Sequence, residues 1–184
     1  MLPDIANRLS NLSKALETVI VPAIPDDNPF AKEQAALMLG HLAMLSEQWD
    51  AVYLYERGSL HNMTALARRL IACTDGLPAS AALDRLAALL QDQPECLPLT
   101  ASGLNAITKE VGTAVDQLIE VAFSEAGQHY RDCVTSQVLQ YNRLQATRER
   151  IWFRRHGMDP DEKELGTLEE MLHTTKYLLD GDLS

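Results

Sequence analysis

Apolar residues recur every three or four positions along most of this chain, and this period constrains the fold more than any other feature. Between Pro3 and Val21, one stripe is formed by Ile5, Leu9, Leu12, Leu16 and Val19, the spacing of one helix face. The sequence contains no run of alternating β-branched residues, the pattern that would indicate a β-strand. The sequence therefore predicts an all-α protein, an antiparallel helical bundle of five or six helices with at least two long ones.

Proline, glycine and capping residues divide the chain into predicted helices within a single domain, residues 1–184. The predicted helices cover 1–21, 29–73, 80–91, 102–156 and 160–180. Pro22 and Pro25 are expected to end the first helix, because proline has no backbone N–H. Gly58 either breaks or kinks the second helix, and Gly127 is the expected break in the fourth. Glycine in mid-helix at Gly40 predicts close packing where two helices cross.

Helices of unequal length leave part of an apolar stripe without a neighbour in the same chain. A second copy of the protein is a natural cover for such a stripe, so we expect a homodimer. A different protein partner is the other expectation that this pattern supports.

Net charge and cysteine content limit the partners and the cellular compartment that we expect for the protein. The net charge of −10 disfavours nucleic acid as a partner, since phosphate backbones repel an acidic surface. Three scattered cysteines, Cys73, Cys96 and Cys133, suggest free thiols in a reducing compartment. No basic leader with an apolar run and no membrane-length apolar segment is apparent, so a cytoplasmic protein without membrane contact is expected.

Basic charge is concentrated in residues 131–156, which hold six arginines and two acidic residues. Within this segment Arg148 follows Tyr141 and Leu144 on the helical stripe that continues to Ile151. Arginine binds carboxylates and phosphates through a planar fork, so the segment predicts an anion site. The acidic C-terminal residues are the alternative partner of these arginines, and the sequence leaves the choice open. The candidate anion-binding residues are Arg148, Arg150, Arg154 and Arg155.

Two further constellations could bind a ligand. Aromatic and polar side chains could line an internal pocket of the bundle, and the candidates are Trp49, Tyr53, His129, Tyr130 and Tyr141. Glu125, His129 and Cys133 follow each other at four-residue steps and can share one helix face, which is a start for a zinc or iron site. Glu170 and His173 form one Glu-x-x-His pair. A di-iron site in a helical bundle needs two such pairs, and the sequence contains no second one.

No nucleophile elbow, phosphate-binding loop or dinucleotide fingerprint occurs in the sequence. We therefore expect a protein without a catalytic site or cofactor, which acts through self-association or a protein partner. A small-molecule-binding bundle and a metal-binding bundle are the alternatives.

The first fifty residues also carry a family resemblance. It rests on Ala15-Leu16-Glu17, Val21-Pro22-Ala23-Ile24, Gln34 and Gly40-His41-Leu42. This pattern resembles small uncharacterised bacterial helical proteins that accompany aminoglycoside-phosphotransferase-like kinases and acyl-CoA dehydrogenases. The resemblance implies a bacterial accessory protein near acyl-CoA or aromatic catabolism, and it carries no catalytic residue to this chain.

Overall fold

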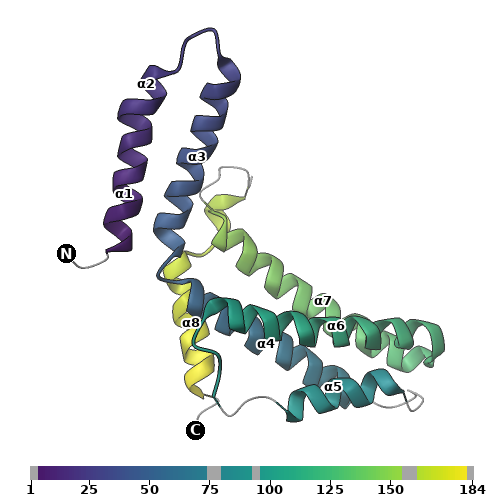
Figure 1. The fold of residues 1–184 in the computed structure, drawn as a ribbon. Helices are drawn as coiled ribbons and strands as arrows, with labels where there is room; N and C mark the ends of the chain where they lie inside the picture. Colours follow the sequence, from purple (N-terminus) through teal and green to yellow (C-terminus); the bar gives the residue numbers. More distant parts are fainter. Residues whose placement is uncertain (1–3, 74–79, 93–95, 155–160, 182–184) are drawn as a thin grey trace. The chain divides into compact units, whose positions relative to one another are not determined.

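The computed structural model describes residues 4–73, 80–92, 96–154 and 161–181, with only the backbone at 162, 177 and 179–181. Every regular element in these ranges is a helix and none is a strand (Figure 1), which confirms the all-α prediction. The sequence suggests a single domain, 1–184, whereas the structure groups the chain into two compact units. The first unit is Met1–Ala51 with Trp152–Glu164, and the second is Val52–Ile151 with Leu165–Ser184.

The first unit consists mainly of two long helical segments. The first comprises α1 (Ile5–Ala15), a π-helical turn (Leu16–Ile20) and α2 (Val21–Ala23), and the second is α3 (Pro29–Gln48). α1 packs against α3. Asp4 and Asn28 cap the two starts, each accepting a hydrogen bond from a backbone N–H three residues later.

The prediction that Pro22 ends the first helix is wrong, because the helix continues through it to Ala23. Proline cannot donate the usual bond to the carbonyl four residues earlier, and its ring crowds that carbonyl. The π-helical turn before Pro22 widens the helix, so that the Val21 N–H bonds to the Leu16 carbonyl five residues back. The helix ends where Ile24 becomes extended, the conformation that a following proline, Pro25, favours.

The predicted helix 29–73 is two helices. α3 ends at Gln48, residues 49–51 form a turn, and α4 covers Val52–Ala72. Gly58 is therefore not the break, since it lies inside α4. The sequence pattern predicted a break or a kink at Gly58 because glycine has a low helix propensity. The structure instead places glycine there because the side chain of Arg148, described below, occupies the space of a Cβ atom.

The second unit contains the remaining long helices. They are α4 (Val52–Ala72), α5 (Ala81–Gln91), α6 (Ala101–Glu125), α7 (Gln128–Trp152), of which Trp152 is grouped with the first unit, and α8 (Leu168–Gly181). Ser80 and Thr100 cap α5 and α6. The break at Gly127 is confirmed: Ala126 is extended and α7 begins one residue after the glycine.

The core of the second unit lies where α6 packs against α4 and α5 and where α7 adds its first turns. α8 packs on α4 separately. Along α6, apolar residues that recur at the helical period are buried, among them Leu104, Val111 and Leu118. The core comprises Leu66, Ala67, Leu70, Leu86, Val111, Ala114, Val115, Leu118, Ala122, Ala126, Tyr130 and Val134.

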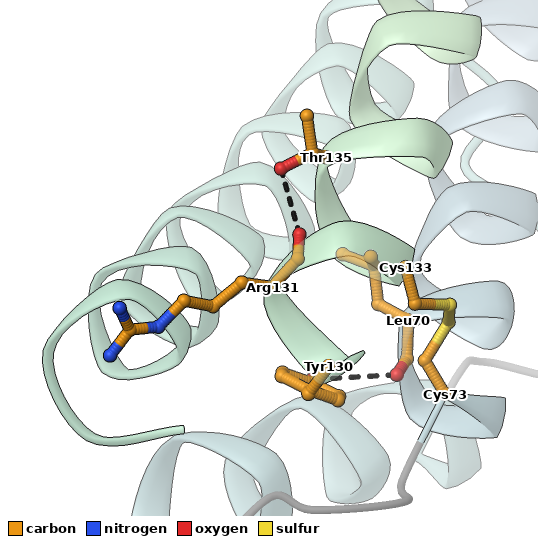
Figure 2. The surroundings of a disulfide bond; sticks show 6 residues. All are labelled: Leu70, Cys73, Tyr130, Arg131, Cys133 and Thr135. Carbon is orange, nitrogen blue, oxygen red and sulfur yellow. Dashed lines mark hydrogen bonds between the residues drawn. A yellow bond between two sulfur atoms is a disulfide. The ribbon is translucent and has the colours of Figure 1, made fainter. Parts of the chain in front are cut away.

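A disulfide joins the end of α4 to the first turns of α7. Cys73 and Cys133 are 60 residues apart in sequence and their Cα atoms are 6.3 Å apart. Beside them the Tyr130 hydroxyl donates a hydrogen bond to the Leu70 carbonyl at 3.5 Å (Figure 2). The prediction of three free thiols is therefore wrong for this pair, while Cys96 is free and exposed. This disulfide removes the argument from which a reducing compartment was inferred.

Among the described residues, no helix combines the length and the apolar character that a membrane crossing would need.

Candidate functional site

An arginine is buried in the second unit on the apolar face of α7. Arg148 is only 6% exposed. Its Nη1 donates to the Thr175 hydroxyl of α8 at 2.9 Å, and its Nη2 donates to the Tyr55 carbonyl of α4 at 3.0 Å. The guanidinium carbon lies 5.0 Å from the centroid of the Tyr55 ring, in the range of a cation–π contact. One guanidinium therefore contacts two other helices.

Gly58 makes room for this guanidinium. A Cβ atom at position 58 would lie 2.7 Å from the Arg148 Nη2 and 2.7 Å from the Thr175 Cγ2. Both distances are shorter than two such atoms can approach. Glycine on this face of α4 is thus a requirement of packing, which explains a residue that otherwise weakens a helix.

The buried charge has no carboxylate partner within the described part of the chain. Its hydrogen bonds go to a hydroxyl and a carbonyl, and its Nε is buried with no hydrogen-bond partner. Burial lowers the pKa of Arg148 below the ordinary value for arginine, and the nearby Tyr55, Tyr141 and Glu56 partly oppose this. Arginine nevertheless stays protonated in proteins, so the site holds a desolvated positive charge.

A cavity of about 270 Å³ lies beside Arg148, lined by α4, α7, α8 and the residues just before α8. Much of its wall is apolar, with Leu144, Ile151, Met171 and Leu178 among the lining residues. Leu144 and Leu178 are about half exposed, which places an opening to solvent on their side. Binding pockets commonly combine such an apolar wall with a few polar groups. Here the polar lining residues are His61, Asn62, Thr147, Arg148, Thr167, Glu170, Thr174 and Thr175.

The acidic lining residue Glu170 caps the start of α8. Its Oε2 accepts a hydrogen bond from the Thr167 N–H at 2.7 Å, and the Thr167 hydroxyl accepts one from the Glu170 N–H at 3.2 Å. This reciprocal pair is a capping box. His173 instead lies 3.7 Å from Glu169 on an exposed face. Glu170 and His173 are therefore engaged separately, which gives no support to a di-iron half-site.

Of the four predicted anion-binding arginines, Arg148 alone among the described ones lines this cavity. Arg150 is exposed on α7, Arg154 belongs to the first unit, and Arg155 lies outside the described residues. The sequence signal for Arg148 was its place on the apolar stripe with Leu144 and Ile151, both of which line the cavity too. Tyr55, Gly58 and Thr175 carried no such signal, because they come from other helices.

The five predicted pocket residues do not come together at this cavity. Tyr130 is fully buried in the core, and the Tyr53 hydroxyl donates to the Pro98 carbonyl at 2.9 Å. Tyr141 packs beside the core, whereas His129 is exposed. Trp49 belongs to the first unit. The described lining of the cavity includes none of them.

The metal-site hypothesis is wrong for its only thiol ligand, Cys133. Cys133 is bonded to Cys73, so it offers no thiolate to a metal. Glu125 and His129 are exposed on the surface. Across the described residues, no group of three or more histidine, cysteine or acidic side chains could hold a metal ion.

No protein-family model matches the chain, and neither a curated protein nor a solved structure is significantly similar to it.

Proposed function

We propose that this protein is a helical-bundle protein that binds a small molecule reversibly in the cavity between α4, α7 and α8. The observation that carries the proposal is a mostly apolar cavity of about 270 Å³ with a buried, incompletely hydrogen-bonded guanidinium in its wall. A water molecule takes up about 30 Å³ in the liquid, so the cavity has the volume of roughly nine waters. A ligand with a short apolar body fits that space.

The partial hydrogen bonding of Arg148 supports binding over a purely structural role. A structural arginine in a protein interior is normally paired with a carboxylate and has its donors satisfied. The buried Nε of Arg148 has no partner, and the adjoining wall is hollow rather than packed. A ligand would supply the missing packing and an acceptor for the guanidinium N–H groups that Thr175 and the Tyr55 carbonyl leave unused.

Small neutral probes with an apolar body test the proposal. We expect 1-octanol or 3-phenylpropanol, titrated to millimolar concentration, to shift backbone amide NMR signals saturably at Gly58, Gly166 and Met171. Leu144→Trp should fill the opening and raise the Kd of these probes at least about tenfold. A tenfold change corresponds to about 1.4 kcal/mol of binding free energy, which the probe loses when the larger side chain takes its place against the apolar wall. Leu139→Trp is the matched control, because Leu139 is also half exposed on α7 but outside this cavity. Absence of saturable shifts with these probes and their charged analogues would overturn the proposal.

Self-association through the first unit is the second candidate function. Within its described residues, α1 and α3 together with the π-helical turn bury only Leu16 and Ala35 as apolar side chains, while Leu12, Val19 and Met38 are more than half exposed. Two-helix arrangements cannot cover both stripes, and a second copy of the same pair would complete a four-helix bundle. Sedimentation equilibrium at micromolar concentration tests this: a dimer that Leu12→Glu dissociates supports it, and a monomer at every concentration rejects it.

A further inference from the structure

We infer that the head group recognised in this cavity is a single carboxylate, held by the Arg148 guanidinium, on a ligand with a short apolar body. This inference rests on the proposed small-molecule function and specifies its ligand class. It starts from the donors of Arg148. A guanidinium has five N–H donors, and the contacts with Thr175 and Tyr55 use two of them. The Nε–H remains without a partner inside the protein.

The cost of leaving this charge buried favours an anion over a neutral ligand. Desolvating a cation without a counter-ion is expensive, and an anion that enters the same site recovers much of that cost. Thr175 and the Tyr55 carbonyl already hold the guanidinium in place. An entering anion therefore meets a fixed donor and loses little free energy in ordering it.

The number of charges favours a carboxylate over a phosphate. Arg148 is the one lysine or arginine among the described residues that line the cavity. One guanidinium balances one negative charge, and its planar fork matches the two oxygens of a carboxylate. A phosphate dianion would remain half neutralised, and the Glu170 carboxylate, which caps α8 and lines the same cavity, repels a dianion more strongly than a monoanion. An ammonium ligand would face a like charge.

The apolar wall of the cavity determines the chemical character of the rest of the ligand. Leu144, Ile151 and Met171 line the same cavity as Arg148, so an apolar chain or ring can be buried while the carboxylate is paired. Burying such a body adds about 0.8 kcal/mol of binding free energy per methylene group. The structure thus fits an amphipathic monocarboxylate better than a small polar acid such as acetate.

A series of probes that differ only in the head group tests the inference on the full chain. Octanoate, 1-octanol and octylamine share one body, as do 3-phenylpropanoate, 3-phenylpropanol and 3-phenylpropylamine. We expect each carboxylate to bind at least about tenfold more tightly than its alcohol, the effect of one charged hydrogen-bonded pair, and each amine to bind more weakly than the alcohol. The Arg148 Nε–H signal in ¹⁵N NMR should shift with the carboxylates and not with the alcohols.

Variants at Arg148 separate the head group from the body. Arg148→Met keeps a stem about as long as the aliphatic part of arginine and removes the guanidinium, so the preference for each carboxylate over its alcohol should disappear. Arg150→Met on the exposed face of α7 is the control and should preserve the preference. If Arg148→Met does not fold, the head-group ratio and the Nε–H shift in the wild-type protein decide the question.

The outcomes distinguish the two proposals. If none of the six probes binds, the proposed function and the ligand class both fail. If alcohols and carboxylates bind the wild-type protein equally, or if the preference persists in Arg148→Met, the carboxylate inference is overturned while small-molecule binding stands.

Discussion

In the first unit α1 and α3 pack on each other with little buried between them, whereas in the second unit α6 is covered by α4 and α5 and by the first turns of α7. Both units are built from amphipathic helices with the same apolar spacing. Along the first helical segment, Leu12 on α1 is 58% exposed, while Leu16 at the start of the π-helical turn is buried. On α6 the stripe residues Leu104, Val111 and Leu118 are all buried.

This difference shows that an apolar stripe reports which side of a helix needs cover and not whether the chain supplies it. A helix with one neighbour buries the line of contact, and a helix with several neighbours buries its whole stripe. In the second unit the helices have enough neighbouring helices to form a core, and the same unit contains the cavity. The first unit has an apolar face that the self-association proposal would use.

Truncation of a leucine in each unit should test the comparison with the largest effect. Leu118→Ala removes a fully buried side chain from the core, so we expect the free energy of unfolding to fall by about 2–5 kcal/mol. Leu12→Ala changes an exposed position, so a change within about 0.5 kcal/mol is expected. Urea unfolding followed by circular dichroism measures both. A large loss for Leu12→Ala that depends on protein concentration would show that its face is covered by a second copy.

Removal of the disulfide should have the next largest effect. Cys73→Ser with Cys133→Ser opens a loop of 60 residues, and loss of such a cross-link is expected to cost about 2–4 kcal/mol. Cys96→Ser is the control, because that thiol is free and exposed and its replacement should leave the unfolding midpoint unchanged. Equal midpoints for the wild-type protein with and without a reductant would contradict a stabilising bridge.

Alanine at Gly58 and alanine at Gly40, two glycines inside different helices, should move stability in opposite directions. Gly58→Ala places a Cβ against the Arg148 guanidinium and the Thr175 methyl, so we expect a loss of about 1–3 kcal/mol from overpacking. Gly40→Ala on α3 meets nothing within 4 Å, so it should gain about 0.5–1 kcal/mol of helix propensity. Thermal unfolding of both variants decides this, and a stabilised Gly58→Ala would refute the close approach of Arg148.

Alkaline pH should weaken the second unit by the smallest amount. Every tyrosine belongs to it, and burial raises the pKa of Tyr130 above the ordinary value of 10.0. The unfolded chain therefore ionises first, so this contribution is complete below about pH 10 and is lost as the pH rises through the folded pKa. Urea midpoints across this range should fall less steeply for Tyr130→Phe than for the wild-type protein. Identical slopes would remove Tyr130 as a cause.

Helix positions were predictable to the extent that local chemistry decides them. The break at Gly127 and the helical period along α6 both followed from residues close in sequence. The break after Gln48 and the path of the helix through Pro22 did not. The first lacks a proline or glycine, and the second depends on a π-helical turn that absorbs the missing N–H.

The candidate site was predictable in one residue. Arg148 lies on an apolar stripe and belongs to a basic segment, and both facts can be read from the sequence. Its partners Tyr55 and Thr175 are 93 and 27 positions away, and nothing local links them to it. The aromatic candidates failed for the same reason: Tyr130 packs in the core because of what surrounds it, while an equivalent tyrosine elsewhere could line a pocket.

By itself the sequence determined the all-helical character of the chain and the apolar face of each helix, because period, capping and proline act within a few residues. The tertiary structure alone decided which stripes are buried, that Cys73 meets Cys133, and that Gly58 leaves room for a buried arginine beside a cavity. These depend on side chains that approach from separate helices, and burial, pairing and desolvation are properties of that approach.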